Sequence, residues 1–282
     1  MTTDAPKTRS RLRTSLGRGA LPTWAVLGYV YLFAPILVIV AFSFNDLGGA
    51  VHPFNYKWQG FTLDNWRHPF KYPDLVHALG LSLEIAVIAS FVATVMGSMI
   101  ALAQSRYRFR GNGLVDVILV LPLTTPEICL GSSLLTLFLT TGRPALGFWT
   151  ILIAHIMFCV SFVALTVKAR IRGFDWTLED AAMDLGATPA RVFARVTFPL
   201  ILPGILAAFL LSFSLSIDDY IITVFNAGST VTFPIQIFAQ QKISVPAQID
   251  VLASMVLLTS LALIGAGSVL RYVRRSGRPV GA

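Results

Sequence analysis

The stretch EDAAMDLGATPARVFARVTFPLILPG, residues 179–204, lies between two long apolar segments of the chain. It carries acidic and basic side chains, glycines and prolines, although the whole chain is 55% hydrophobic and only 13% charged. Apolar side chains at its start recur at helical spacing and form one face of a short helix. They are Leu178, Ala181, Ala182 and Leu185. The segment is too polar to span a membrane and too apolar on that face to remain uncovered.

Local signals give this first helix a start and an end. We expect Thr177 to cap it, because a threonine side chain accepts a hydrogen bond from a free amide of the first turn. Glu179 and Asp180 then lie at the positive end of the helix dipole. Gly186 suits the end of the helix, since glycine readily adopts a left-handed backbone.

A second short helix is expected directly after the glycine. Thr188 followed by Pro189 is typical of a cap and a first helical position. The residues 191–196 would continue this helix as far as Phe198-Pro199. The pair could lie flat on the bilayer surface. However, the small alanines at the centre of the first apolar face are poor membrane anchors, and they favour close approach by a protein partner.

The composition indicates an integral membrane protein. Soluble domains average about 25% charged residues, well above the fraction found here. A spanning helix needs about 20 apolar residues, because each residue adds about 1.5 Å of length. Six segments satisfy this requirement: 22–44, 78–104, 113–140, 147–167, 200–224 and 250–270. The sequence therefore predicts an all-α protein with six transmembrane helices.

The basic residues predict the orientation of these helices. The residues before the first span resemble the start of a signal peptide, but the apolar run is too long and no cleavage pattern follows Phe44. With the N-terminus inside, most lysines and arginines fall in inner segments, as the positive-inside rule requires. The outer segments hold only Lys57, Arg67, Lys71, Arg143 and Lys242. Both termini are therefore expected in the cytoplasm.

The charge and the cysteines exclude other classes of protein. The formal net charge of +8 follows from topology and contact with anionic lipid, and it does not indicate nucleic-acid binding. Cys129 and Cys159 lie in predicted spans and are expected to be buried free thiols. No metal-ligating cluster and no catalytic residues are predicted.

A phosphate-binding GxxxxGK[ST] loop does not occur in this sequence. The short Gly111-Asn112-Gly113 follows an arginine cluster and not a strand, so it is expected to be a turn. The chain itself is therefore expected to bind no cofactor. If ATP drives its activity, another chain must bind it.

The third predicted span contains two prolines close together. Pro122 and Pro126 precede Glu127, and each removes a helical hydrogen bond. A broken helix at membrane depth is tolerated only beside protein or a water-filled cavity. A transport path near 122–127 is therefore plausible from sequence.

The opening stretch resembles the EAA loop of permease subunits in ABC importers. That pattern is E-A-A, three residues, G, nine residues, then I-x-L-P. Here Asp180-Ala181-Ala182 are followed after three residues by Gly186, and after nine more by Val196-Thr197-Phe198-Pro199. The spacing matches throughout, with Asp180, Val196 and Phe198 in place of the usual Glu, Ile and Leu.

The resemblance implies a type I ABC importer permease whose loop inserts into a cleft of a cytoplasmic ATPase. The partner ATPase dimer would bind ATP and Mg. The residues implied in coupling to it are Glu179, Asp180, Ala181, Ala182, Gly186, Arg191 and Pro199.

Two further segments resemble the polyamine permeases of the spermidine/putrescine branch, most of all their second permease subunit. They are PEICLGSSLLTLF at 126–138 and LSIDDYIITVFNAG at 215–228. A polyamine carries ammonium groups on a short methylene chain, so carboxylates and aromatic faces suit it. The residues implied in its path are Asp218, Asp219, Tyr220, Phe225 and Glu127. Adjacent helical residues point about 100° apart, so at most one aspartate should face the path.

The resemblance also implies the partners and the division of the chain. A second permease subunit, a different chain, and a soluble external binding protein would complete the importer in the inner membrane. The divisions are 1–21 for a cytoplasmic tail, 22–77 for the first span and external loop, 78–270 for the permease core with its coupling loop at 169–199, and 271–282 for a second tail.

Two other readings remain open. The substrate could be another small solute, or the chain could be an ion-coupled carrier that uses Glu84, Glu127 and His155 as a proton relay. Secondary carriers commonly show related halves, and the two halves here show no convincing repeat. We expect His155 to hydrogen-bond to a neighbouring helix. Asp116 is expected to pair with an arginine of the 106–110 cluster.

Overall fold

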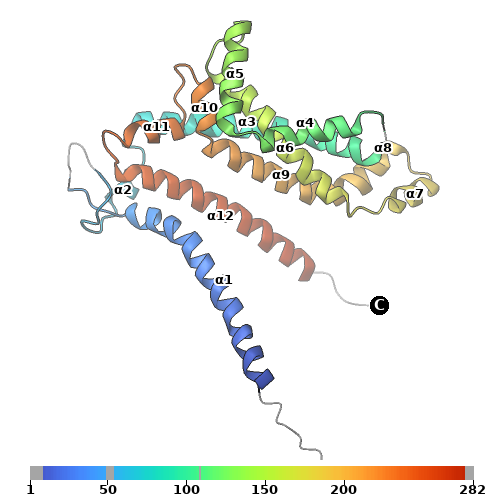
Figure 1. The fold of residues 1–282 in the computed structure, drawn as a ribbon, viewed down its shortest axis with the longest axis horizontal. Coiled ribbons are helices and arrows are strands. Elements are labelled where there is room, and N and C mark those ends of the chain that lie inside the picture. The colour runs from blue at the N-terminus through green and yellow to red at the C-terminus, as the bar shows by residue number, and fades with distance from the viewer. Residues whose placement is uncertain (1–8, 49–53, 108, 277–282) are drawn as a thin grey trace, which may run out of the picture. The chain divides into compact units, whose positions relative to one another are not determined.

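The computed structural model describes residues 9–48, 54–107 and 109–276. Every regular element among these residues is helical (Figure 1). The chain forms two compact units, one of Met1–Tyr72 with Gln241–Ala282 and the other of Pro73–Gln240. Each unit is described separately below.

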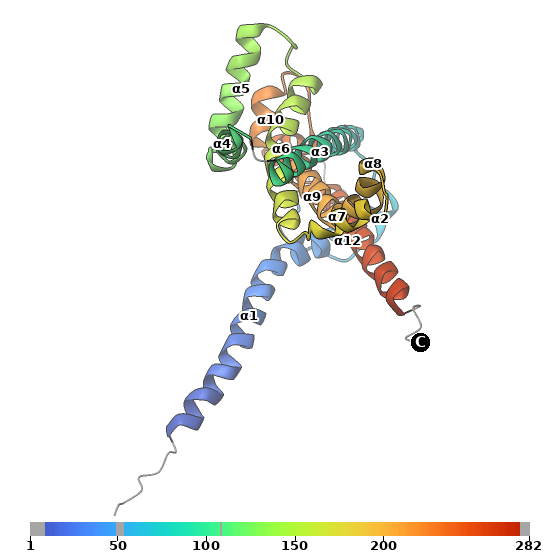
Figure 2. The ribbon, with the colours of Figure 1, turned by 90° about the vertical axis from the view of Figure 1, so that its right-hand side faces the viewer.

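Three long helices form the core of the unit of residues 73–240. They are α3 (Pro73–Arg106), α6 (Phe148–Ile171) and α9 (Phe198–Asp218), and each packs against the other two (Figures 1 and 2). Many of the buried positions are alanines, among them Ala89, Ala93, Ala154, Ala164 and Ala208. Small side chains let helix backbones approach closely, which is how helices associate in a lipid environment.

Two glycines mark the closest approaches within this core. A Cβ atom on Gly97 of α3 would lie 2.7 Å from Val163 of α6. A Cβ atom on Gly204 of α9 would lie 2.6 Å from the side chain of Arg170, whose guanidinium donates to the carbonyl of Leu200 at 3.0 Å. The glycines therefore allow α6 to pass both neighbouring helices.

The third predicted span is broken, as its prolines indicate. Its parts are α4 (Asn112–Thr124) and α5 (Glu127–Thr141), and their axes differ by 108°. The break falls at Thr125, which is extended, and at Pro126. Proline disfavours helical geometry in the residue before it, so Pro126 accounts for the break. Pro122 lies inside α4 and does not interrupt it.

The fifth predicted span begins earlier than expected. The short helices α7 (Thr177–Asp184) and α8 (Pro189–Val192) precede it, and a π-helical turn at Phe193–Thr197 joins α8 to α9. The second short helix therefore does not stop at Phe198-Pro199, and the prediction that it did was wrong. Pro199 cannot donate to the carbonyl of Arg195, and the irregular turn absorbs the missing bond.

The same span also ends earlier than expected. We predicted one apolar helix over 200–224, whereas α9 ends at Asp218 and Asp219 adopts an extended conformation. A short helix, α10 (Ile221–Asn226), follows, and then α11 (Phe233–Gln240). The apolar run is interrupted here because the Asp219 carboxylate accepts hydrogen bonds from the amides of Ile222 and Thr223 at the start of α10.

The unit of residues 1–72 and 241–282 holds α1 (Arg9–Phe42), α2 (Asp64–Arg67) and α12 (Ala247–Ser276). Helix α12 contacts both α1 and α2 (Figure 1). A buried hydrogen-bond chain fixes the connecting loop. The Asn45 amide donates to Asn55 Oδ1 at 2.6 Å, and the Asn55 amide donates to Asp250 Oδ2 at 2.6 Å.

The prediction of an all-helical membrane protein is confirmed. In the described parts of the chain, four helices are long and apolar enough to span a membrane, or five if the bent pair counts as one span. Helix α12 contributes a shorter apolar stretch, Ala247–Ala262. The sixth span stays a prediction. Residues 1–8 and 277–282 of the expected cytoplasmic tails lie outside the described residues.

Candidate coupling loop and transport path

The start of α7 differs in detail from its prediction. Thr177 is the first helical residue and not the cap, so that prediction was wrong. The carboxylate of Asp175 takes the role instead, since its Oδ1 accepts from the Thr177 amide at 3.0 Å and from the Thr177 hydroxyl at 2.8 Å. An acidic side chain two residues earlier reaches the free amide better than the first helical residue can.

The bend between α7 and α8 follows the sequence signals. Gly186 has φ of 82°, in the left-handed region, and its amide donates to the carbonyl of Met183 at 2.8 Å. Thr188 is extended and Pro189 begins α8. Glycine is needed at the bend because a side chain in this conformation would be strained.

The predicted apolar face of α7 is exposed. Leu185 is 89% exposed, and Leu178 is also exposed. Of the two alanines between them, Ala181 is exposed and Ala182 is half-buried. Asp180 lies on the surface of the same loop, as do Arg191 and Pro199 further along it.

Glu179 points in the opposite direction, into the protein. Its side chain is only 4% exposed, and its Oε2 lies 3.0 Å from Nη1 of Arg106 at the end of α3. The hydroxyl of Thr197 donates to Oε1 of the same carboxylate. The Arg106 guanidinium also lies 6.0 Å from the ring centre of Trp176. Glu179 thus braces the loop from within and does not offer its carboxylate to another chain.

Asp116 has a different partner from the one expected. Its Oδ1 lies 2.5 Å from Nζ of Lys168 in α6 and accepts from the amide of Gln104 at 3.1 Å. The expected pairing with an arginine was wrong. Arg106 forms its ion pair with Glu179, and Asp116 forms its ion pair with Lys168 of α6.

The adjacent aspartates at the end of α9 have opposite environments. Asp218 is exposed, whereas the side chain of Asp219 is only 7% exposed. Asp219 Oδ2 accepts from the amide and the hydroxyl of Thr223 in α10, at 2.8 and 2.7 Å. Asp218 is therefore exposed at the break, while Asp219 connects the end of α9 to α10.

His155 of α6 completes the set of buried contacts around Asp219. Its Nδ1 lies 2.7 Å from the hydroxyl of Ser216, and its Nε2 lies 2.9 Å from the hydroxyl of Thr223. Nε2 also lies 3.3 Å from Asp219 Oδ2. The expectation that His155 binds a neighbouring helix is confirmed, and it joins α6 to both α9 and α10.

The other predicted path residues surround the break less uniformly. Tyr220 is half-buried, and its ring centre lies 4.8 Å from that of Phe238. Phe225 packs against Gly131 of α5, where a Cβ atom would lie 2.8 Å from its ring. Glu127 is exposed at the start of α5, close enough to Asp218 for the two negative charges to repel. Asp218 and Glu127 are thus near enough to interact electrostatically, whereas the ring of Tyr220 contacts that of Phe238 and Phe225 packs against α5.

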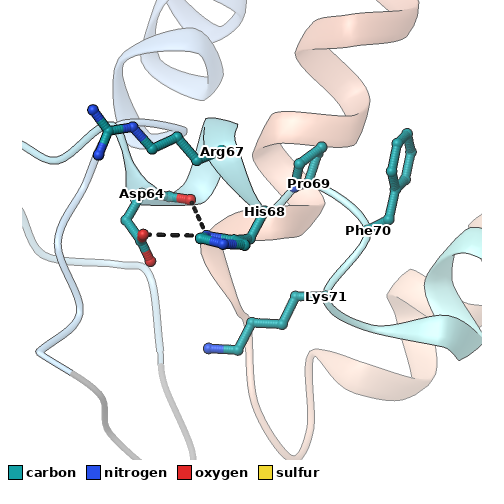
Figure 3. A pocket seen from close by; sticks show the side chains of 6 residues that line it. All are labelled: Asp64, Arg67, His68, Pro69, Phe70 and Lys71. Atoms are coloured by element: carbon teal, nitrogen blue, oxygen red, sulfur yellow. Dashed lines mark hydrogen bonds and ion pairs between the residues drawn. The ribbon is translucent and has the colours of Figure 1, made fainter.

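A separate hollow lies in the predicted outer loop, around α2 (Figure 3). Its lining residues are Asp64, Arg67, His68, Pro69, Phe70 and Lys71. His68 Nδ1 lies 3.2 Å from Asp64 Oδ1, and both side chains are well exposed. The hollow carries charges of both signs and belongs to the other unit of the chain.

Sequence reasoning missed the partners that come from distant parts of the chain. Arg106 was considered only as one of the possible partners of Asp116 and not as the partner of Glu179, and Ser216 and Thr223 were not singled out. The spacing of Asp219 and Thr223, four residues apart, is a local signal for their contact. Cys129 was expected to be buried, but it is exposed, because it lies on the open side of α5.

The comparison with protein families identifies the class of this chain. A family described as "Binding-protein-dependent transport system inner membrane component" matches residues 74–275. The chain belongs to this family. It is therefore an ABC transporter permease component of the inner membrane, with multiple spans, and not itself an enzyme.

Curated relatives are similar over most of their length. The chain is 36% identical to "Spermidine/putrescine transport system permease protein PotC" of Haemophilus influenzae over 84% of this chain and 90% of that protein. It is also 36% identical to the protein of the same name in Escherichia coli, over 88% and 92% of the two chains. "Putrescine transport system permease protein PotI" of Escherichia coli is 36% identical over 82% and 83%.

Solved structures share the fold. A bacterial ABC transporter involved in the import of the acidic polysaccharide alginate contains a chain that matches with a TM-score of 0.65 and 14% identity. The match covers 95% of this chain and all of that one. An amino acid ABC transporter crystallised with histidines matches with a TM-score of 0.56 and 19% identity, over 74% and 98%. These likenesses show the ABC importer permease fold.

Proposed function

We propose that this chain is the permease subunit through which an ATP-driven importer moves a polyamine of the spermidine/putrescine class. The observation that carries the proposal is the exposed carboxylate of Asp218 at a helix break, near enough to Glu127 for the two acids to interact. A carboxylate among apolar helices is costly unless it faces water or a cation. The curated relatives named for spermidine and putrescine support the same substrate class.

The path that we propose uses each group for a different part of the substrate. Asp218 and Glu127 pair with ammonium groups, since two nearby carboxylates repel each other until a cation lies between them. Tyr220 offers an aromatic face to the methylene chain or to a cation. Asp219 and Phe225 shape this region by holding α10 against α6 and α5.

The proposed topology has six spans with both termini in the cytoplasm, as in a type I importer. Its divisions are those expected from sequence: tails at 1–21 and 271–282, a first span and external loop at 22–77, and a permease core at 78–270 with the coupling loop at 169–199. The sixth span would be formed by α12. The distribution of basic residues supports this orientation.

The proposed coupling surface is the exposed face of α7 with the bend at Gly186. The ATPase dimer binds ATP and Mg, and it receives Leu178, Ala182 and Leu185 in a cleft. Asp180, Ala181, Arg191 and Pro199 lie at the edge of this contact, whereas Glu179 fixes the loop to α3 through Arg106. A pull on the loop is therefore transmitted to the core helices.

Three further partners complete the proposed importer. A second permease, encoded by a different chain, closes the path opposite Asp218 and α5. A soluble external protein delivers the polyamine, as the family description implies. The lipid bilayer surrounds the remaining apolar surfaces. No nucleic acid takes part.

The proposal is tested by ATP hydrolysis of the assembled transporter in lipid nanodiscs. Binding protein loaded with spermidine or putrescine should stimulate hydrolysis several-fold over the substrate-free protein. Binding protein mixed with a neutral sugar serves as the control and should not stimulate. A transporter that assembles but responds to neither polyamine would contradict the proposed function.

A further inference from the structure

A buried polar cluster joins three helices next to the proposed path without belonging to it. Its members are His155, Ser216, Asp219 and Thr223. The side chains of His155 and Asp219 are 4% and 7% exposed. Such a cluster is costly to bury in a chain this apolar, so every polar group in it needs a partner.

The contact with the carboxylate fixes the direction of one hydrogen bond of the imidazole. An ionised carboxylate only accepts hydrogen bonds, so the Nε2 that lies 3.3 Å from Asp219 Oδ2 carries a hydrogen. The Thr223 hydroxyl then accepts from Nε2 at 2.9 Å and donates to Asp219 Oδ2 at 2.7 Å. The Nδ1 of His155 lies 2.7 Å from the Ser216 hydroxyl, with which it forms the second hydrogen bond of the ring. Each polar atom of the imidazole is thus satisfied.

This arrangement fixes the backbone at the break. Asp219 is extended, and its carboxylate binds the amide and hydroxyl of Thr223 in the next helix. His155 is the contact that comes from outside the α9–α10 segment and ties it to α6. Without it, a nearly enclosed carboxylate would lose one of its donors and would be drawn towards water. The neighbouring Asp218 would then turn with the shared backbone.

We propose that His155 is a positioning residue that holds Asp219 inside the helices, so that Asp218 alone of the two aspartates faces the transported polyamine. The proposal rests on the proposed function, because it assumes that Asp218 meets the substrate. His155 itself touches no substrate. Its effect should appear in the apparent affinity for the polyamine and not in the basal cycle of the ATPase.

The test uses the complete transporter in proteoliposomes with labelled spermidine. His155→Phe removes both imidazole contacts and keeps a side chain of similar size. Thr223→Val removes the bridging hydroxyl, whereas Thr223→Ser keeps it. Ser212→Ala is the matched control, since Ser212 is buried in α9 and its hydroxyl has no hydrogen-bond partner among the described residues. The measured quantities are KM and maximal rate of uptake, and basal ATP hydrolysis per assembled transporter.

We expect His155→Phe to raise KM by about tenfold, which corresponds to ~1.4 kcal/mol. Thr223→Val should raise KM in the same direction, and Thr223→Ser and Ser212→Ala should keep the parental value. The double variant His155→Phe/Thr223→Val should raise KM no further than His155→Phe alone, because both remove one link. Basal hydrolysis should stay at the parental level.

Three results would overturn the inference. If the variants lower only the amount of transporter and leave KM unchanged, the cluster is structural and the polyamine assignment is untouched. If the two single effects multiply in the double variant, the residues do not act as one link. A parental transporter that moves no spermidine overturns the proposed function itself and the inference with it. Thr223→Val and Thr223→Ser decide the question independently of the amount of His155→Phe recovered.

Discussion

Asp218 and Asp219 differ in environment although they are neighbours in the chain. Asp219 has amide, hydroxyl and imidazole donors around it, whereas Asp218 is exposed near another acid. A buried charge without partners would be expensive, so the better supplied aspartate is the one that turns inward. The exposed one keeps its charge available for a cation.

The first prediction concerns this pair. Asp218→Asn should lower polyamine uptake by about tenfold or more, because a charge-assisted contact with an ammonium group is lost. Assembly and basal ATP hydrolysis should stay near the parental values. Asp219→Asn should instead lower the free energy of unfolding by about 1–3 kcal/mol, because it weakens the hydrogen bonds of a buried group. Uptake and thermal unfolding of the purified assembly measure the two effects.

Glu84→Gln is the control for this prediction, because Glu84 is an exposed acid on α3 and does not belong to the helices that form the break. It should change neither quantity. If both single variants and the double variant Asp218→Asn/Asp219→Asn take up polyamine at the parental rate, the two acids are not part of the path.

At the scale of elements, the apolar runs predicted where the long helices lie. They did not predict where these helices are interrupted. Pro126 predicts the break between α4 and α5 from local sequence, because a proline disfavours helical geometry in the residue before it. The break after Asp218 has a local element, the contact of Asp219 with Thr223, but the contact of Asp219 with His155 comes from a residue distant in sequence and no local pattern could reveal it.

In the loop between α6 and α9, too, local sequence predicted some features and missed those that depend on distant residues. The bend of this loop was predicted correctly from Gly186 and Thr188-Pro189, because turn signals are local. The inward direction of Glu179 could not be predicted, because its partner Arg106 ends another helix. The continuous helix from α8 into α9 was missed because a proline such as Pro199 usually indicates a helix end.

The second prediction concerns the coupling loop. Gly186→Val should strain the bend by about 1–2 kcal/mol, because a β-branched residue disfavours the left-handed backbone. Ala182→Glu should place a charge between Leu178 and Leu185 on the exposed face. Both variants should insert in the membrane but lose ATPase binding or substrate-stimulated hydrolysis. Co-purification with the ATPase measures the first of these effects.

Gly80→Val is the matched control, since Gly80 lies in α3 with open space around it. It should co-purify with the ATPase as the parental chain does. Normal coupling by both loop variants would show that the exposed face of α7 is not the docking surface.

At the scale of the whole molecule, the basic residues support an orientation that the helices alone do not define. The third prediction is that a reporter fused after residue 282 is cytoplasmic and one inserted near Pro53 is external. Both positions lie outside the described residues. A fluorescent and phosphatase reporter pair at each site measures the side. Finding the two reporters on the same side would contradict the six-span topology.

The central claim is that the assembled transporter moves polyamines at the expense of ATP. Its most direct test is ATP-dependent uptake of labelled spermidine by vesicles that hold this chain, its partner permease, the ATPase and the binding protein. We predict saturable uptake that unlabelled spermidine or putrescine reduces and a neutral sugar or an amino acid does not. Uptake that the sugar or amino acid reduces as strongly, or none at all from an assembly that hydrolyses ATP, would contradict the account.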